Sequence, residues 1–149
     1  MKVICKQTTS KGFNLKEVTT VLSTNFDYSF GGYGIELGKE YLVMGIALYK
    51  DSNCIYYLID TSSKPDWLPF LLFEIVENSL PKQWHVKAPG KKENSDIYAL
   101  WGFEELCNEE TFYDRLLERE EAAMRTYFRR KIELEKEIAE QEEMRLLLN

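Results

Sequence analysis

The side chains able to carry acid–base chemistry are few in this sequence and widely spaced. His85 is the sole histidine among the 149 residues, so histidine-based metal sites are excluded and a serine or cysteine nucleophile would depend on this one base. Asp60, Asp66 and Glu74 lie around a predicted hairpin and could approach one another as paired catalytic carboxylates. Turn capping explains the two aspartates as well or better.

The sequence motifs of the common enzyme classes are missing. No glycine–serine elbow, kinase signature, dinucleotide fingerprint or metal-ligand spacing occurs. The glycine cluster at residues 30–34 lacks the Lys-Ser/Thr ending of a phosphate loop, so it indicates a tight turn. We therefore expect no catalytic residue, no metal and no cofactor, and a protein that acts by binding.

Composition points to one domain with an appendage, located in the cytoplasm. The longest apolar run, near residues 67–76, is broken by Pro69 and Glu74 and is far shorter than the roughly 20 residues of a membrane span. The first residues turn polar too early for a secretory signal. Cys5, Cys54 and Cys107 are an odd number at wide spacing, so we expect reduced, buried thiols.

The net charge is concentrated at one end of the chain. Residues 1–103 hold 11 lysines and 11 acidic residues, whereas residues 104–149 hold 8 basic and 14 acidic residues, which accounts for the whole net charge of −6. A nucleic-acid binder needs a basic face, so nucleic acid is not the expected partner. Complementary fields favour a basic protein partner, although an acidic helix that is simply solvated remains the alternative.

Two groups of side chains are the predicted contacts with that partner. The aromatic content of 13% exceeds what the interior of a small barrel holds easily, so some tyrosines and tryptophans are expected at the surface as interface anchors. A large aromatic core is the alternative, and for any single tryptophan it is the favoured one. The predicted partner-binding residues are Glu118, Glu120, Glu121, Glu133, Glu135, Glu137, Trp67 and Trp84.

The elements that would position these side chains are mostly strands. Residues 40–49 and 54–60 are rich in β-branched and aromatic types on either side of a polar tetrapeptide, which predicts a β-hairpin. Residues 67–70 return as a short strand, with Pro69 keeping it at an edge. Further strands are predicted near residues 3–5, 19–30, 80–87 and 96–103, the last of them closing the sheet.

From about Glu109 the composition becomes that of a helix, with no glycine or proline before the end. Apolar residues recur on one face as far as Phe128, so the first half is predicted to pack on the sheet. The second half must stand in solvent, pair with another helix or lie on a partner. Because no heptad pattern is sustained, a coiled coil is not favoured firmly.

The strand pattern resembles small bacterial barrels of the Src-homology-three-like type. The resemblance rests on residues 38–46 (GKEYLVMGI), 57–60 (YLID), 65–69 (PDWLP) and 72–76 (LFEIV). With residues 80–84 (LPKQW) and the Glu/Arg-rich final helix added, the pattern looks like bacterial immunity proteins of toxin systems. It covers about residues 36–130 and transfers no binding residue, because it consists of framework positions.

The expected fold is α+β, a small antiparallel β-barrel or strongly bent sheet followed by one long C-terminal helix. Residues 1–103 form the β-rich domain, and residues 104–149 form an acidic helix packed on it in its first half. The resemblance implies an immunity protein that covers a cognate toxin, often a basic nuclease. The alternatives are an adaptor that forms a homodimer through the C-terminal helix, and an enzyme or ligand-binding barrel using Asp60, Asp66, Glu74 and His85.

Overall fold

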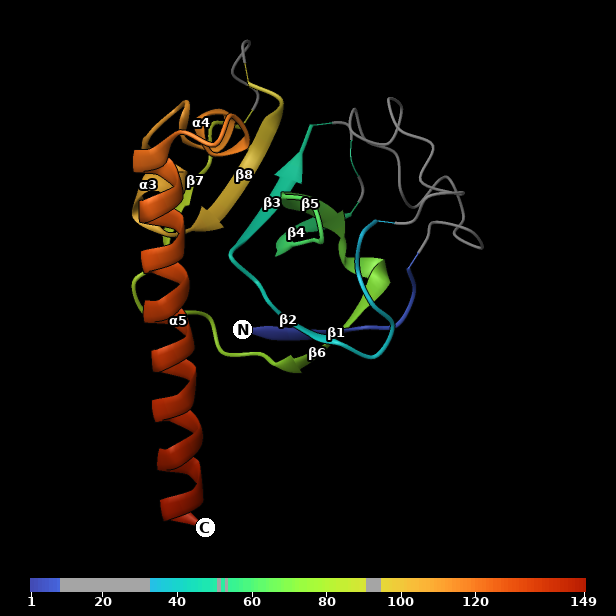
Figure 1. The fold of residues 1–149 in the computed structure, drawn as a ribbon, viewed down its shortest axis with the longest axis vertical. Coiled ribbons are helices and arrows are strands. Elements are labelled where there is room, and N and C mark those ends of the chain that lie inside the picture. The colour runs from blue at the N-terminus through green and yellow to red at the C-terminus, as the bar shows by residue number, and fades with distance from the viewer. Residues whose placement is uncertain (9–32, 51, 53, 91–94) are drawn as a thin grey trace.

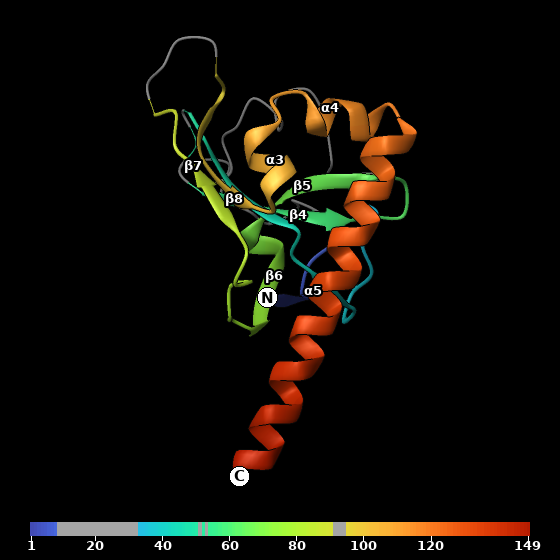
Figure 2. The same cartoon turned by 90° about the vertical axis from the view of Figure 1, so that its left-hand side faces the viewer.

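The structure, a computed structural model, describes residues 1–8, 33–50, 52, 54–90 and 95–149. These residues form two antiparallel sheets and a layer of helices (Figures 1 and 2). The α+β class and the long C-terminal helix predicted from the sequence are confirmed. The strand predicted within residues 19–30 and most of the glycine cluster lie outside the described residues.

The larger sheet has the strand order β5-β4-β3-β8-β7. Its strands are β3 (Gly45–Tyr49), β4 (Ile55–Asp60), β5 (Pro65–Pro69), β7 (His85–Lys87) and β8 (Ile97–Gly102). The predicted hairpin is the β3–β4 pair, with Ile46 opposite Tyr57. Strand β5 lies at the sheet edge, where Pro69 leaves no ladder hydrogen bond unmade. Strand β8 does not close the sheet, because it lies between β3 and β7.

The smaller sheet consists of β1 (Lys2–Cys5) between β2 (Glu40–Leu42) and β6 (Phe73–Glu77). The apolar run at residues 40–49 therefore serves both sheets. It pairs with β1 through β2, passes through Val43 and Met44, and pairs with β4 through β3. Because the described strands form two separate sheets with free edges, the predicted barrel does not close.

Strand β4 is covered on both faces, which makes the larger sheet the middle layer of the molecule. Tyr56 and Leu58 belong to the core between this sheet and the helices. Tyr57 and Ile59 belong to a second core beneath the smaller sheet. Alternation of side chains along a strand sends neighbours to opposite faces. A strand buried on both sides needs the nearly continuous apolar run found here.

The segment of residues 104–149, predicted as one long helix, is divided into α3 (Glu104–Asn108), α4 (Phe112–Leu117) and α5 (Glu121–Leu148). Tertiary packing overrides helix propensity here. The breaks allow α3 and α4 to insert Leu106 and Phe112 into the core. Arg115 spans both breaks, pairing with Glu109 at 2.5 Å and Glu120 at 3.2 Å. The second break also uses a left-handed backbone at Arg119, with φ of 59°.

Helix α3 rests on a flat part of the larger sheet that two glycines create. Gly45 and Gly102 lie opposite each other in the β3–β8 pair. A Cβ at either position would lie 2.8 or 2.7 Å from Leu106 Cδ2, closer than packed carbon atoms can approach. The absence of both side chains therefore allows the α3 backbone to approach the strands.

Helix α5 packs on the body well beyond the half predicted from the sequence. Tyr127 is fully buried, and Leu134 and Ile138 are buried as well. Figure 2 shows the helix crossing the whole height of the body before it extends beyond it. Cys5, Cys54 and Cys107 are buried free thiols, as predicted. No helix among the described residues is long and apolar enough to cross a membrane.

Candidate protein-binding groove beside helix α5

The four residues of the enzyme alternative are not brought together. Ile59 is opposite Asp66 and Asp60 is opposite Pro65 in the β4–β5 ladder, so the two aspartates leave opposite faces of the sheet. Glu74 lies on β6 and pairs with Lys6 at 3.5 Å. His85 is exposed on β7. The described residues therefore form no shared pocket from this set.

Asp60 instead anchors helix α5 to the end of β4. Its carboxylate accepts a hydrogen bond of 2.5 Å from the Tyr127 hydroxyl and pairs with Lys131 Nζ at 2.5 Å. Burial, followed by the negative charge of Asp60, raises the pKa of Tyr127 far above its ordinary value. The tyrosine consequently stays a hydrogen-bond donor at every physiological pH.

Several of the predicted acidic contacts are already paired within the molecule. Glu120 is engaged by Arg115, and Glu121 is paired with Arg125 one helical turn away. Glu118, at the end of α4, is exposed and makes no ion pair with any residue that the structure describes. The start of α5 therefore offers less free negative charge than its composition indicates.

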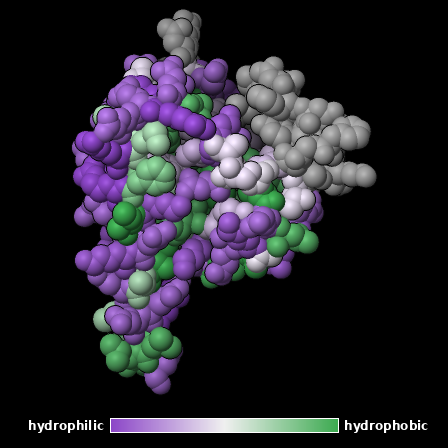
Figure 3. Space-filling model, in the orientation of Figure 1, coloured by the Kyte–Doolittle hydropathy of each residue, from purple (hydrophilic) through white to green (hydrophobic). Residues whose placement is uncertain are grey.

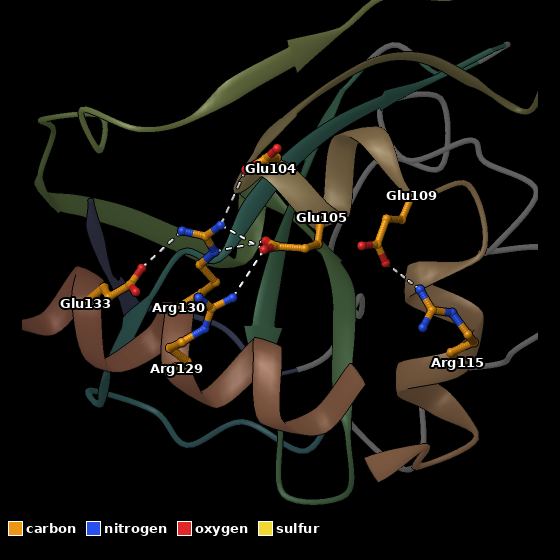
Figure 4. Close-up of polar contacts among 7 residues, drawn as sticks. All are labelled: Glu104, Glu105, Glu109, Arg115, Arg129, Arg130 and Glu133. Carbon is orange, nitrogen blue, oxygen red and sulfur yellow. Dashed lines mark hydrogen bonds and ion pairs between the residues drawn. The ribbon is translucent and has the colours of Figure 1, made fainter. Parts of the chain in front are cut away.

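Glu133 is also neutralised, by the arginine cluster drawn in Figure 4. Arg130 binds Glu105 through two nitrogens at 2.8 and 2.9 Å and contacts Glu133 at 3.2 Å. Arg129 reaches the same Glu105 at 3.2 Å. The hydrogen bonds from Arg130 hold the pKa of Glu105 below its ordinary value. The cluster thus fixes α3 against α5 and leaves little charge free.

The segment at residues 77–84 is tied to helix α5 at two points. Arg145 donates to Glu77 Oε2 at 2.7 Å and to Oε1 at 3.0 Å. The backbone N–H of Lys82 donates to Glu137 Oε1 at 3.0 Å, and Gln141 donates to the same oxygen at 3.3 Å. These tethers hold the segment beside the helix and create a groove between them.

The groove consists of two adjoining hollows of about 400 and 410 Å³ that share Lys82, Glu137 and Glu140. The first has an apolar floor and an aromatic wall, and the second runs along the helix towards Arg145. Met44, Phe103 and Leu134 form the floor, which is part of the buried core. Trp84 is half-buried at the wall. We refer to these hollows together as the α5 groove.

The charges around the α5 groove are of both signs. Glu133, Glu137 and Glu140 line it together with Lys82, Arg130 and Lys136. Arg130 is already engaged by the carboxylates of the arginine cluster. Glu140 makes no ion pair within the described residues, and the same holds for the exposed Glu135 and Glu143. A cationic group entering the first hollow would therefore find a carboxylate without an ion-pair partner among the described residues, in a hollow that Trp84 also lines.

The structure separates the two tryptophans that were predicted together. Trp67 is 6% exposed, and its ring packs against those of Tyr49 and Tyr113 at centroid distances of 6.4 and 5.9 Å. It is a core residue and not the exposed anchor that composition predicted. Trp84, by contrast, lines the α5 groove next to the predicted Glu133 and Glu137.

Sequence reasoning missed Lys82, Lys136 and Glu140 as groove residues. Glu140 follows Glu137 by three positions, so both lie on one helical face. That spacing could have identified it. The position of Lys82 depends on where the segment after β6 folds, and nothing local in the sequence indicates it.

The described part of the chain contains no cluster of three or more His, Cys, Asp or Glu side chains able to hold a metal ion. Comparisons of the chain with protein-family models, with curated proteins and with solved structures found no match. The function must therefore be argued from the groove and its charges.

Proposed function

We propose that this chain is a binding protein that neutralises a cognate bacterial toxin by direct contact, using the α5 groove. The partner presents a cationic side chain, with an arginine as the best fit. The observation that carries the proposal is that Glu140, which has no ion-pair partner among the described residues, lines the same hollow as the half-buried Trp84. The immunity role itself comes from the resemblance of the strand and helix pattern to proteins of toxin systems.

The chemistry of the groove suits a guanidinium group. Arginine stacks on an aromatic face and binds a carboxylate through two parallel hydrogen bonds. Trp84 supplies the aromatic face, and Glu140 supplies a carboxylate that no described residue occupies. The apolar floor would cover the stem of the side chain. A toxin with a basic nucleic-acid-binding face carries such arginines in abundance.

The surrounding charge supports the encounter. Residues 133–148 of α5 hold six glutamates against Lys136 and Arg145, and Arg145 is occupied by Glu77. Complementary charge chiefly raises the association rate and makes it depend on salt. Lys82 and Lys136 oppose a cationic partner at the rim, so their removal should help binding.

The proposal is tested with the purified chain and the toxin encoded beside its gene. Binding is measured by calorimetry at low and moderate salt for the wild type, E140K and K82E/K136E. We expect E140K to weaken the complex about tenfold, because the partner's guanidinium loses its carboxylate, and K82E/K136E to strengthen it. E110K is the matched control, because Glu110 is exposed, lies far along the chain from the groove and carries the same charge change.

Absence of a complex at moderate salt would refute the immunity role. Equal losses in E140K and E110K would show that the effect is one of net charge alone, and the α5 groove would no longer be the contact. Survival of cells that co-express the toxin with the wild type, but not with E140K, provides the matching measurement in vivo.

A further inference from the structure

Helix α5 carries a second apolar surface, on the side away from both the core and the groove. Phe128 is 50% exposed, Ile132 is 65% exposed and Leu146 is 79% exposed. With the exposed Ala139, these residues are the apolar members of what we call the outer stripe. Figure 3 shows hydrophobic side chains emerging at intervals along α5 and gathering at its C-terminal end.

The outer stripe has the spacing of a helix–helix seam. Its positions, 125, 128, 132, 135, 139, 142 and 146, are separated by alternating steps of three and four residues, which places them on one side of a helix. The buried residues Tyr127, Leu134 and Ile138 occupy another side. The seam is hard to recognise in the sequence because Arg125, Glu135 and Glu142 interrupt it. The seam can be recognised once the structure shows which apolar residues of α5 are buried in the core.

Charge is divided along the outer stripe. At its N-terminal end, Arg119, Arg125 and Arg129 line a hollow of about 740 Å³ around Phe128 and Ile132, and they outnumber the two glutamates that line it, Glu121 and Glu133. Arg125 also pairs with Glu121 and Arg129 with Glu105, so the positive excess at this end is small. At its C-terminal end the exposed neighbours are Glu135, Glu142 and Glu143, of which Glu142 has a long contact of 3.8 Å with Lys2 Nζ. A parallel copy of the helix would place like charges together. An antiparallel copy would place the arginines of one helix beside the glutamates of the other.

One antiparallel register matches size or charge at two of its three kinds of facing pair. If residues whose numbers sum to 267 face each other, Phe128 meets Ala139 of the second copy and Arg125 meets its Glu142. A large residue then lies against a small one, and an arginine against a carboxylate. At the centre, Ile132 packs against the aliphatic stem of Glu135, whose carboxylate points to solvent. The overlap runs from Glu121 to Leu146, about 39 Å at 1.5 Å per residue, so it uses nearly the whole of α5.

We propose that the occupant of the outer stripe is a second copy of this chain, bound through α5 in this antiparallel register. The two bodies then lie on the outer sides of the helix pair, because each core contact is made by a different side of α5. The proposal is independent of the function proposed above, since the α5 groove and the outer stripe lie on different sides of the helix.

The mass of the full chain in solution is the first test, measured by analytical ultracentrifugation over a range of concentrations. We expect a monomer–dimer equilibrium in which F128E raises the dissociation constant by at least about 30-fold. V86E is the matched control, because Val86 is 59% exposed on β7 and lies outside the stripe, so its dissociation constant should be unchanged. R125E and E142R should each weaken the dimer, and the double variant R125E/E142R should recover it.

Cross-linking tests the register. E121C and L146C variants are mixed under mild oxidation, while the three native thiols remain buried. A 121–146 cross-link between chains supports the antiparallel register, because a disulfide needs Cα atoms within about 7 Å. Cross-links formed only between identical positions would overturn it. A wild-type chain that stays monomeric at its highest soluble concentration, or a dimer unaffected by F128E, would overturn the proposal as a whole. Toxin binding should survive F128E, so failure here is distinguishable from failure at the groove.

Discussion

Replacing Glu77 by glutamine should loosen the C-terminal part of α5 and lower the stability of the protein in a pH-dependent way. Glu77 is the one charged residue that is buried among those described, with 6% exposure. The hydrogen bonds from Arg145 are the main cause that lowers its pKa from 4.5 to about 2. These bonds join β6 to the last turns of α5, residues 68 positions apart.

The magnitude follows from the change in pKa. Lowering the pKa of Glu77 from 4.5 to about 2 corresponds to about 3.4 kcal/mol of unfolding free energy, at 1.36 kcal/mol for each pKa unit. This is an upper limit, because the Arg145 side chain is 56% exposed and water screens its charge. We therefore expect E77Q to lose about 1–2 kcal/mol of unfolding free energy at pH 7.

The pH dependence has a definite sign. Because the folded-state pKa is lowered, the contribution of Glu77 is present above about pH 4.5 and is lost as the pH falls towards 2. Urea unfolding of wild type and E77Q should show a gap at pH 7 that narrows below pH 4.5. E74Q is the control: Glu74 lies on the same strand, is 69% exposed and pairs with Lys6 at 3.5 Å, so its loss should stay under about 0.5 kcal/mol. An E77Q gap that is absent at pH 7, or constant down to pH 3, would refute this account.

Three further perturbations test the packing that positions the groove. Y127F removes the hydroxyl that donates to Asp60 and should cost about 1–2 kcal/mol in urea unfolding; an unchanged midpoint would show that this contact is not needed. G45A would place a Cβ 2.8 Å from Leu106 Cδ2 and should destabilise by about 1–3 kcal/mol, with a smaller added loss when L106A is already present. Burial raises the pKa of the Cys107 thiol to about 11, so alkylation at pH 8 should require denaturant, and rapid labelling of the native protein would contradict this.

The local sequence determined the strands and helices that are specified by residues adjacent in the chain. The apolar runs around the tetrapeptide at residues 50–53 specify the β3–β4 hairpin, because β-branched and aromatic residues favour strands and a short polar link favours a tight turn. Pro69 specifies an edge strand for the same local reason. The helix-forming composition of residues 121–148 specifies α5.

Only the tertiary structure decided where that helix begins. One helix was expected over residues 104–149, yet the chain breaks twice within this segment so that Leu106, Phe112 and Leu116 can all enter the core. The gain from burying these side chains exceeds the gain from two extra turns of helix. The balance between burying these side chains and extending the helix depends on the shape of the sheet, so the sequence alone does not reveal it.

The tertiary structure likewise decided which charges and which tryptophan remain available. Composition located the negative charge in residues 104–149, but the partners of Glu77, Glu105 and Asp60 come from segments 25 to 71 positions away. Trp67 and Trp84 both follow prolines at similar spacing in the sequence, and only the positions of β5 and α5 bury one and leave the other beside the groove. Charge pairing and burial act through space, whereas secondary-structure preference acts along the chain, and this difference sets the boundary between what the sequence determined and what the fold decided.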